Sequence, residues 1–134
     1  MSIAVVHSNT AEGRAALVYA AKEADLRRKR LLVLYVFDGD EGPASEADLS
    51  ALRAEVQQLL HNGGVGDATW ELRTAVEPGD GAGGLVTLTQ RVGPELLVIG
   101  SRRRSVGKLL IASAVQRMVL DSPVPVLVVK APAD

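Results

Sequence analysis

Short apolar runs alternate with longer amphipathic stretches along this chain of 134 residues. Four of the runs are almost continuously apolar, which is typical of strands covered on both faces in a parallel sheet. A fifth segment, residues 69–76, alternates apolar and polar positions and is predicted to be an edge strand. The four buried strands are expected at residues 3–6, 31–36, 96–99 and 124–129.

Four helices are predicted between these strands, because apolar residues there recur at helical spacing. Thr10, Ser45 and Asp80 are the expected N-caps of the first three helices, and Asp48 completes a capping box with Ser45. Glycines after Asp80 each weaken the third helix by about 1 kcal/mol relative to alanine. The expected inner faces consist of Leu17, Ala20, Ala21 and Ala24; Leu49, Leu52, Val56, Leu59 and Leu60; Leu85, Leu88 and Val92; and Ile111, Ala114, Val115 and Met118.

The order of these elements defines the fold class. Strands and helices alternate as β-α-β-α-β-α-β-α-β, and right-handed crossovers make this a doubly wound, three-layer α/β sandwich. We expect a five-stranded parallel sheet in the order 3-2-1-4-5 with four helices. A length of 134 residues suits one domain, residues 1–134, without a linker or an internal repeat.

Composition narrows the function classes. Apolar residues make up 47% of the chain, and a net charge of −1 argues against a general nucleic-acid surface. The absence of cysteine excludes disulfides and thiolate metal sites and fits a reducing compartment. The N-terminus lacks the pattern of a signal peptide, and no apolar run approaches the roughly 18 residues of a membrane span. We therefore expect a cytoplasmic protein with neither nucleic-acid nor membrane partners.

The fourth strand ends at Gly100 and leads into a basic loop. Ligands of open parallel sheets bind just beyond the carboxyl ends of the strands, so this loop is the first candidate site. It is not a P-loop, because six residues separate Gly100 from Gly107 and Leu109 stands where a hydroxyl is required. Its positive charge either binds phosphate or forms a solvated turn, and spacing alone leaves both readings open. The basic residues are Arg102, Arg103, Arg104 and Lys108.

Other polar residues offer less chemistry. His7 follows the first strand at the same edge as Gly100 and can contact a ligand, although an ordinary polar loop histidine is the simpler interpretation. His61 stands at a predicted helix C-terminus, where a cation suits the dipole. Neither histidine has enough neighbours for a metal site, and Ser8 lacks the third group of a catalytic triad. The acidic loop at residues 38–41 either contacts ribose or magnesium or is plain surface.

Three segments, in this order and spacing, carry a family resemblance. The first is IAVVHSNTAEGRAALVYAAKEADLRRKRLLVLYVF, the second VEPGDGAGGLVTLTQRVGPELLVIG, and the third SAVQRMVLDSPVPVLVVKA. They resemble the first β-α-β unit, the approach to the fourth strand, and the final helix and strand of the universal stress protein family. The resemblance covers nearly the whole chain and implies a five-stranded parallel sheet and, commonly, a dimer.

Within that family, one branch binds ATP through a loop patterned Gly-x2-Gly-x9-Gly-Ser/Thr, and another branch lacks the pattern and does not bind ATP. Here Gly100 matches the first position and Ser113 the final hydroxyl, whereas Arg103 and Ala112 replace the two other glycines. The loop is also one residue shorter than the pattern. The acidic residue that many members carry after the first strand is replaced around His7. These departures imply altered geometry or weaker affinity for a nucleotide.

We therefore expect a non-catalytic regulatory protein of the universal stress type with a degenerate adenine-nucleotide site. The ligand would be ATP or another adenine nucleotide, and no structural metal is expected. One alternative is a dimeric interaction module of the same fold that binds no nucleotide, and another is a slow ATPase. The base and ribose are expected near the first two strands and the phosphates near the basic loop. The expected site residues are His7, Ser8, Val36, Phe37, Gly100, Arg102, Arg103, Lys108, Ser113 and Ala114.

The last strand is the expected partner surface. It is almost wholly apolar and lies at a sheet edge in the expected order, and an exposed apolar edge invites pairing with another chain. We expect a symmetric homodimer, the commonest arrangement for such a pair, with a downstream partner that the sequence does not identify. The contacts would come from Val124, Val126 and Val128.

Overall fold

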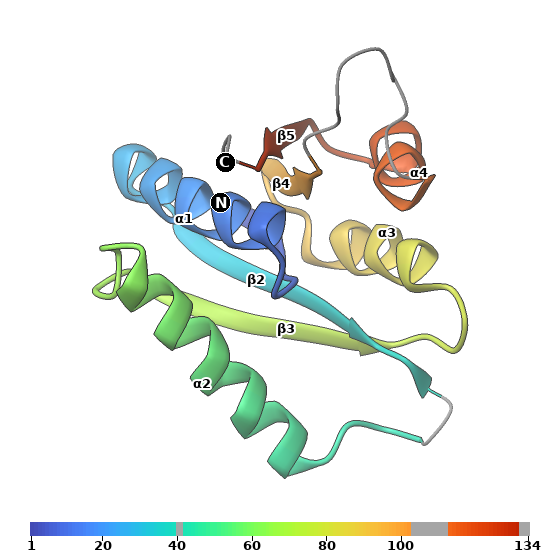
Figure 1. The fold of residues 1–134 in the computed structure, drawn as a ribbon. Helices are drawn as coiled ribbons and strands as arrows, with labels where there is room; N and C mark the ends of the chain where they lie inside the picture. The colour runs from blue at the N-terminus through green and yellow to red at the C-terminus, as the bar shows by residue number, and fades with distance from the viewer. Residues whose placement is uncertain (40–41, 103–112, 132–134) are drawn as a thin grey trace.

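The computed structural model describes residues 1–39, 42–102 and 113–131. Along these residues strands and helices alternate in the expected order (Figure 1). Figure 1 shows the helices arranged in two layers around one sheet. The elements are β1 (Ser2–Val6), α1 (Ala11–Arg27), β2 (Arg30–Phe37), α2 (Glu46–Asn62), β3 (Trp70–Val76), α3 (Gly81–Val92), β4 (Leu96–Ser101), α4 (Ser113–Asp121) and β5 (Val126–Lys130).

The five strands form one parallel sheet in the order β3-β2-β1-β4-β5, so the expected topology is confirmed. Val5 in the central strand aligns with Val33 of β2 and Val98 of β4, and all three are fully buried. β3 and β5 lie at the edges. Alternation along β3 follows from this position, because Trp70 and Leu72 pack against the core while Glu71 and Arg73 stay exposed.

Helix starts follow their local sequence. Thr10 caps α1 by accepting a hydrogen bond from the Gly13 N–H at 3.0 Å, and Asp80 caps α3 in the same way. Ser45 and Asp48 form the expected capping box at the start of α2. Each of these bonds joins residues three apart, which explains why sequence alone predicted them.

Apolar residues of the strands divide between the two faces of the sheet. Ile3 and Val5 pack against α1 and α2, whereas Ala4 packs beneath α3. Residues of α4 complete the second face with the buried side chains of Val115 and Met118. The result is the expected three-layer arrangement. No helix in the described ranges is long and apolar enough to cross a membrane.

Two expectations about the C-terminal region are wrong. Ala114, expected on the inner face of its helix, is exposed, because Val115 and Met118 occupy that face. The last strand begins at Val126 rather than Val124, since Pro125 has no N–H to donate and contributes only its carbonyl, which accepts from the Leu97 N–H. Ile111, also expected on the inner face, lies outside the described residues.

Candidate functional site at the carboxyl edge of the sheet

The carboxyl ends of β1, β2 and β4 meet at one edge, and residues from all three were predicted to form the site. Arg103 and Lys108 lie outside the described residues, and the side chain of Ser113 is likewise not described. The remaining predicted residues can be placed. They fall into three groups, which differ in burial and in their partners.

The first group lines a groove of about 310 Å³ where β2 ends beside the start of α3. Val36 and Phe37 from β2, two of the expected site residues, belong to this lining. The groove lies at the ends of β2 and β3 beside the start of α3, and its lining includes no residue of β1 or β4, the two strands between which a doubly wound sheet of this order opens its crevice. Its other lining residues are Asp38, Glu77, Gly79, Asp80 and Gly81.

Asp80 is an ionised carboxylate in the lining of this groove, and Arg117 balances its charge. Its Oδ1 accepts hydrogen bonds from the Gly83 N–H at 3.1 Å and from Nη1 of Arg117 at 2.6 Å. The Gly83 N–H foremost, and then the Arg117 guanidinium, hold the pKa of Asp80 below its ordinary value. The ion pair with Arg117 also connects α4 to the start of α3 and holds the carboxylate in position. Because its pKa is lowered, the carboxylate is ionised at neutral pH.

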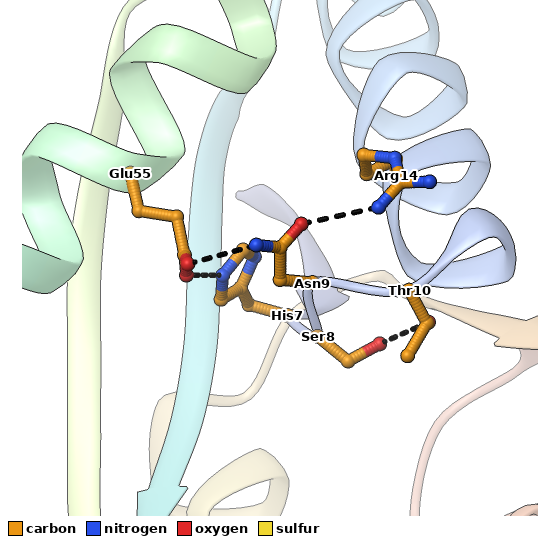
Figure 2. Close-up of polar contacts among 6 residues, drawn as sticks. All are labelled: His7, Ser8, Asn9, Thr10, Arg14 and Glu55. Atoms are coloured by element: carbon orange, nitrogen blue, oxygen red, sulfur yellow. Dashed lines mark hydrogen bonds and ion pairs between the residues drawn. The ribbon is translucent and has the colours of Figure 1, made fainter.

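His7 forms the second group, and its environment differs from the polar loop that was expected. Its side chain is 1% exposed, and Nε2 donates to Oε2 of Glu55 in α2 at 2.7 Å (Figure 2). The ring lies 6.1 Å from that of Tyr35 on the face covered by α1 and α2. Its Nδ1 is buried without a hydrogen-bond partner among the described residues. His7 therefore joins β1 to α2 and does not line the groove.

The turn after β1 extends this polar contact. The Asn9 side-chain amide donates to Glu55 at 3.1 Å and accepts from Arg14 at 3.1 Å, while the hydroxyls of Ser8 and Thr10 share a bond of 2.9 Å (Figure 2). The predicted ligand residue Ser8 is thus half-buried and already hydrogen-bonded within its own turn. Sequence reasoning missed Glu55 and Asn9, because 46 positions separate them and no local pattern connects them.

Gly100 begins the third group, and its surroundings explain why it is glycine. A Cβ at this position would lie 2.5 Å from the carbonyl carbon of Glu12, closer still to its oxygen, and 3.0 Å from the Gly13 nitrogen. The end of β4 therefore packs directly on the first turn of α1. This packing requires glycine whether or not a phosphate also approaches the backbone here.

Arg102 continues from β4 into solvent. Its side chain is 77% exposed, and Nε lies 3.9 Å from Oε1 of Glu12, a contact too long to hold the guanidinium firmly. Ala114 is exposed in the first turn of α4. The carboxyl edge thus carries an acidic groove at the end of β2 and an exposed cation at the end of β4.

The fold is that of a doubly wound α/β protein, with a groove at the carboxyl edge of its sheet. The model of the universal stress protein family matches residues 1–130. A universal stress protein from Mycolicibacterium smegmatis is 38% identical over 138 residues, covering 96% of each chain. The chain belongs to the universal stress protein family.

Solved structures agree with this fold. A universal stress protein from Archaeoglobus fulgidus has a TM-score of 0.75 at 24% identity and covers 97% of this chain and 98% of its own. A universal stress protein from the same organism, solved in complex with dAMP, has a TM-score of 0.71 at 20% identity, with coverage of 97% and 98%. At these identities the similarity shows the fold, and the nucleotide belongs to that relative.

Proposed function

We propose that this protein is a regulatory universal stress protein that binds an adenine nucleotide at the carboxyl edge without hydrolysing it. The observation that carries the proposal is the separation of charge along this edge. Carboxylates line the groove at the end of β2, and Arg102 is exposed at the end of β4. A nucleotide has the matching asymmetry, with a neutral nucleoside at one end and anionic phosphates at the other.

This asymmetry orients the ligand. Val36 offers apolar side-chain surface to a base, whereas the Phe37 side chain packs against Tyr35 on the opposite face of the sheet. The nearby Glu77 can accept hydrogen bonds from ribose hydroxyls but would repel phosphate. Phosphates would therefore extend toward Arg102, whose guanidinium can hold them through two hydrogen bonds. A groove of about 310 Å³ is at the small end for ligand pockets, which suits a nucleoside with its phosphates outside.

The departures from the family loop limit the expected affinity. Arg103 and Ala112 replace glycines, so the backbone approach to phosphate is restricted and side-chain cations must supply more of the binding. ATP and the shorter adenine nucleotides remain candidates. Lys108 and Ser113 from the predicted site would add a charge and a hydroxyl to the phosphate end.

The side chains at the carboxyl edge support the proposal that the protein does not hydrolyse the nucleotide. Phosphoryl transfer depends on positioned charge and on a group that orients the nucleophile. The one histidine at this edge, His7, is buried against Glu55, and Asp80 is engaged by Arg117. A binding protein therefore fits these residues better than the slow ATPase considered above.

Thermal shift with ATP, ADP, AMP and cyclic AMP tests the proposal. A nucleotide at ten times its Kd stabilises the folded state by about 1.4 kcal/mol, which is a measurable rise in Tm. Replacing Arg102, Arg103 and Arg104 with glutamate should abolish that rise, whereas Arg53→Glu, an exposed change on α2, should preserve it. No shift in the wild type at millimolar nucleotide would favour the ligand-free interaction module. Phosphate release above a no-enzyme control that is lost in the triple variant would favour the slow ATPase over a binding protein.

We propose also that the protein is a homodimer paired through β5. This strand has one unpaired edge, and Val126 and Val128 are only half-buried. Sedimentation at micromolar concentration should give twice the monomer mass of 14.1 kDa, and a monomer alone would contradict the pairing.

A further inference from the structure

A second groove lies at the opposite, amino edge of the sheet. It has a volume of about 480 Å³ and is bounded by the end of α1, the start of β2 and the connection between α2 and β3. β2 runs the whole distance between the two edges, and its eight residues span roughly 25 Å. The amino-edge groove is therefore separate from the nucleotide site proposed above, and it is the larger of the two.

The floor of the amino-edge groove is apolar. Ala21, Ala24 and Leu31 form part of it, and each is at most 3% exposed. Val65 and Ala68 from the loop after α2 add half-buried apolar surface. A concave space of this size, in which apolar side chains lie beneath polar groups, is within the range of small-molecule sites.

The rim of the groove is charged. Lys22, Asp25, Arg28 and Asp67 line it, and none of the four side chains has a hydrogen bond or ion pair within the part of the chain that the structure describes. Nearby basic residues behave differently. Arg27 pairs with Glu23 at 2.8 Å, and Arg30 pairs with Glu71 at 2.9 Å. Lys29 also lines the groove and lies 3.8 Å from Glu95, so Lys22 and Arg28 are the lining cations without a partner among the described residues.

Arg28 is also unusual in its backbone. It ends α1 in the left-handed region, with φ 56° and ψ 46°, and is the only non-glycine residue with positive φ among those described. Helix α3 ends in the same conformation with Gly93, the residue ordinarily found there. An arginine in this position strains the backbone, and such strain is concentrated at functional sites. The backbone here closes α1 with two hydrogen bonds, from the Arg28 N–H to the Asp25 carbonyl at 3.1 Å and from the Lys29 N–H to the Ala24 carbonyl at 2.8 Å. Neither bond needs an arginine side chain, and that side chain has no partner in the described residues.

We propose that the amino-edge groove is a second ligand site, specific for a small organic anion with an apolar body. The apolar body would rest on Ala21, Ala24 and Leu31, and Arg28 with Lys22 would bind its carboxylate or phosphate monoester. Asp25 and Asp67 repel further negative charge, so a carboxylate or a single phosphate group fits this rim better than a polyphosphate. A ligand contact would explain why arginine occupies a left-handed position that otherwise favours glycine, because the site needs the guanidinium group.

Two substitutions separate binding from structure. Arg28→Gly removes the guanidinium and relieves the left-handed strain, so it should raise Tm by about 3–5 °C while weakening anion binding at least fivefold. Lys22→Gln removes the second cation on an exposed face and should weaken binding without changing Tm. Arg53→Gln makes the same charge change as Lys22→Gln on α2, outside the groove, and should bind as the wild type does.

Benzoate and phenyl phosphate are suitable probes, with benzyl alcohol as a neutral control of similar shape. In NMR titrations, one or both anions should shift the amide resonances of Leu31, Val65 and Ala68. Benzyl alcohol should bind at least fivefold more weakly. The preferred anion identifies carboxylate or phosphate as the natural group. The proposal is overturned if neither anion moves these amides, if benzyl alcohol binds equally well, or if Arg28→Gly and Lys22→Gln retain wild-type affinity.

Discussion

Replacing Gly100 with alanine would test the packing of β4 on α1, on which the geometry of the carboxyl edge depends. The added methyl group would lie 2.5 Å from the Glu12 carbonyl carbon and 3.0 Å from the Gly13 nitrogen. Non-bonded carbon atoms ordinarily approach to about 3.5–4.0 Å, so the strand end and the helix would have to separate by about 1 Å. All of these contacts are with backbone atoms. No change of side-chain rotamer can therefore relieve them.

The cost follows from this geometry. Overpacking in well-packed proteins costs about 1–3 kcal/mol, and the upper part of that range applies because two backbone segments must move. Against a total stability of roughly 5–15 kcal/mol, a loss of about 3 kcal/mol is large. For a chain of this size it corresponds to a fall in Tm of about 10 °C.

Urea unfolding and thermal melts would measure this loss, with Gly81→Ala as the matched control. Gly81 lies in the first turn of α3 with no atom within 4 Å of an added Cβ, so alanine there should be neutral or stabilise by up to about 1 kcal/mol. A Gly100→Ala variant as stable as the wild type would refute the packing argument. If that variant kept its stability but lost nucleotide binding, Gly100 would serve the ligand rather than the fold.

Three further changes have defined outcomes. Asp80→Asn keeps an N-cap but removes a carboxylate whose pKa is lowered by a backbone N–H of α3 and by Arg117. The stability that this charge contributes is present above about pH 4 and is lost as the pH falls through the lowered pKa. The free energy of unfolding in urea between about pH 5 and 2 should therefore depend less on pH in the variant than in the wild type. Glu55→Ala leaves Nε2 of His7 buried without its partner and should cost about 1–3 kcal/mol in urea, whereas Glu55→Gln, which can still accept the bond, should cost less; equal losses would show that the hydrogen bond is unimportant. Leu17→Ala removes a fully buried side chain and should lower the free energy of unfolding by about 2–5 kcal/mol, and a loss below 1 kcal/mol would contradict the close packing of α1 on the sheet.

Sequence alone determined the local structure. Thr10, Ser45 and Asp80 cap their helices as predicted, because each capping bond spans three residues and depends on little beyond them. The nearly continuous apolar runs identified the buried strands, and alternation identified β3 as an edge. The handedness of β-α-β crossovers, together with the family resemblance, then gave the strand order. Val36 and Phe37 were placed correctly at the carboxyl edge for the same reason, since they simply end a strand.

Tertiary structure decided what surrounds these residues. His7 looked like a loop histidine, but a partner 48 positions away, Glu55, holds it in the interior. Gly100 looked like a phosphate contact, and only the approach of α1 revealed its role in packing. The amino-edge groove with Arg28 had no signal in the sequence pattern. Periodicity specifies which face of an element is buried, whereas the distances between elements depend on how all of their side chains pack together.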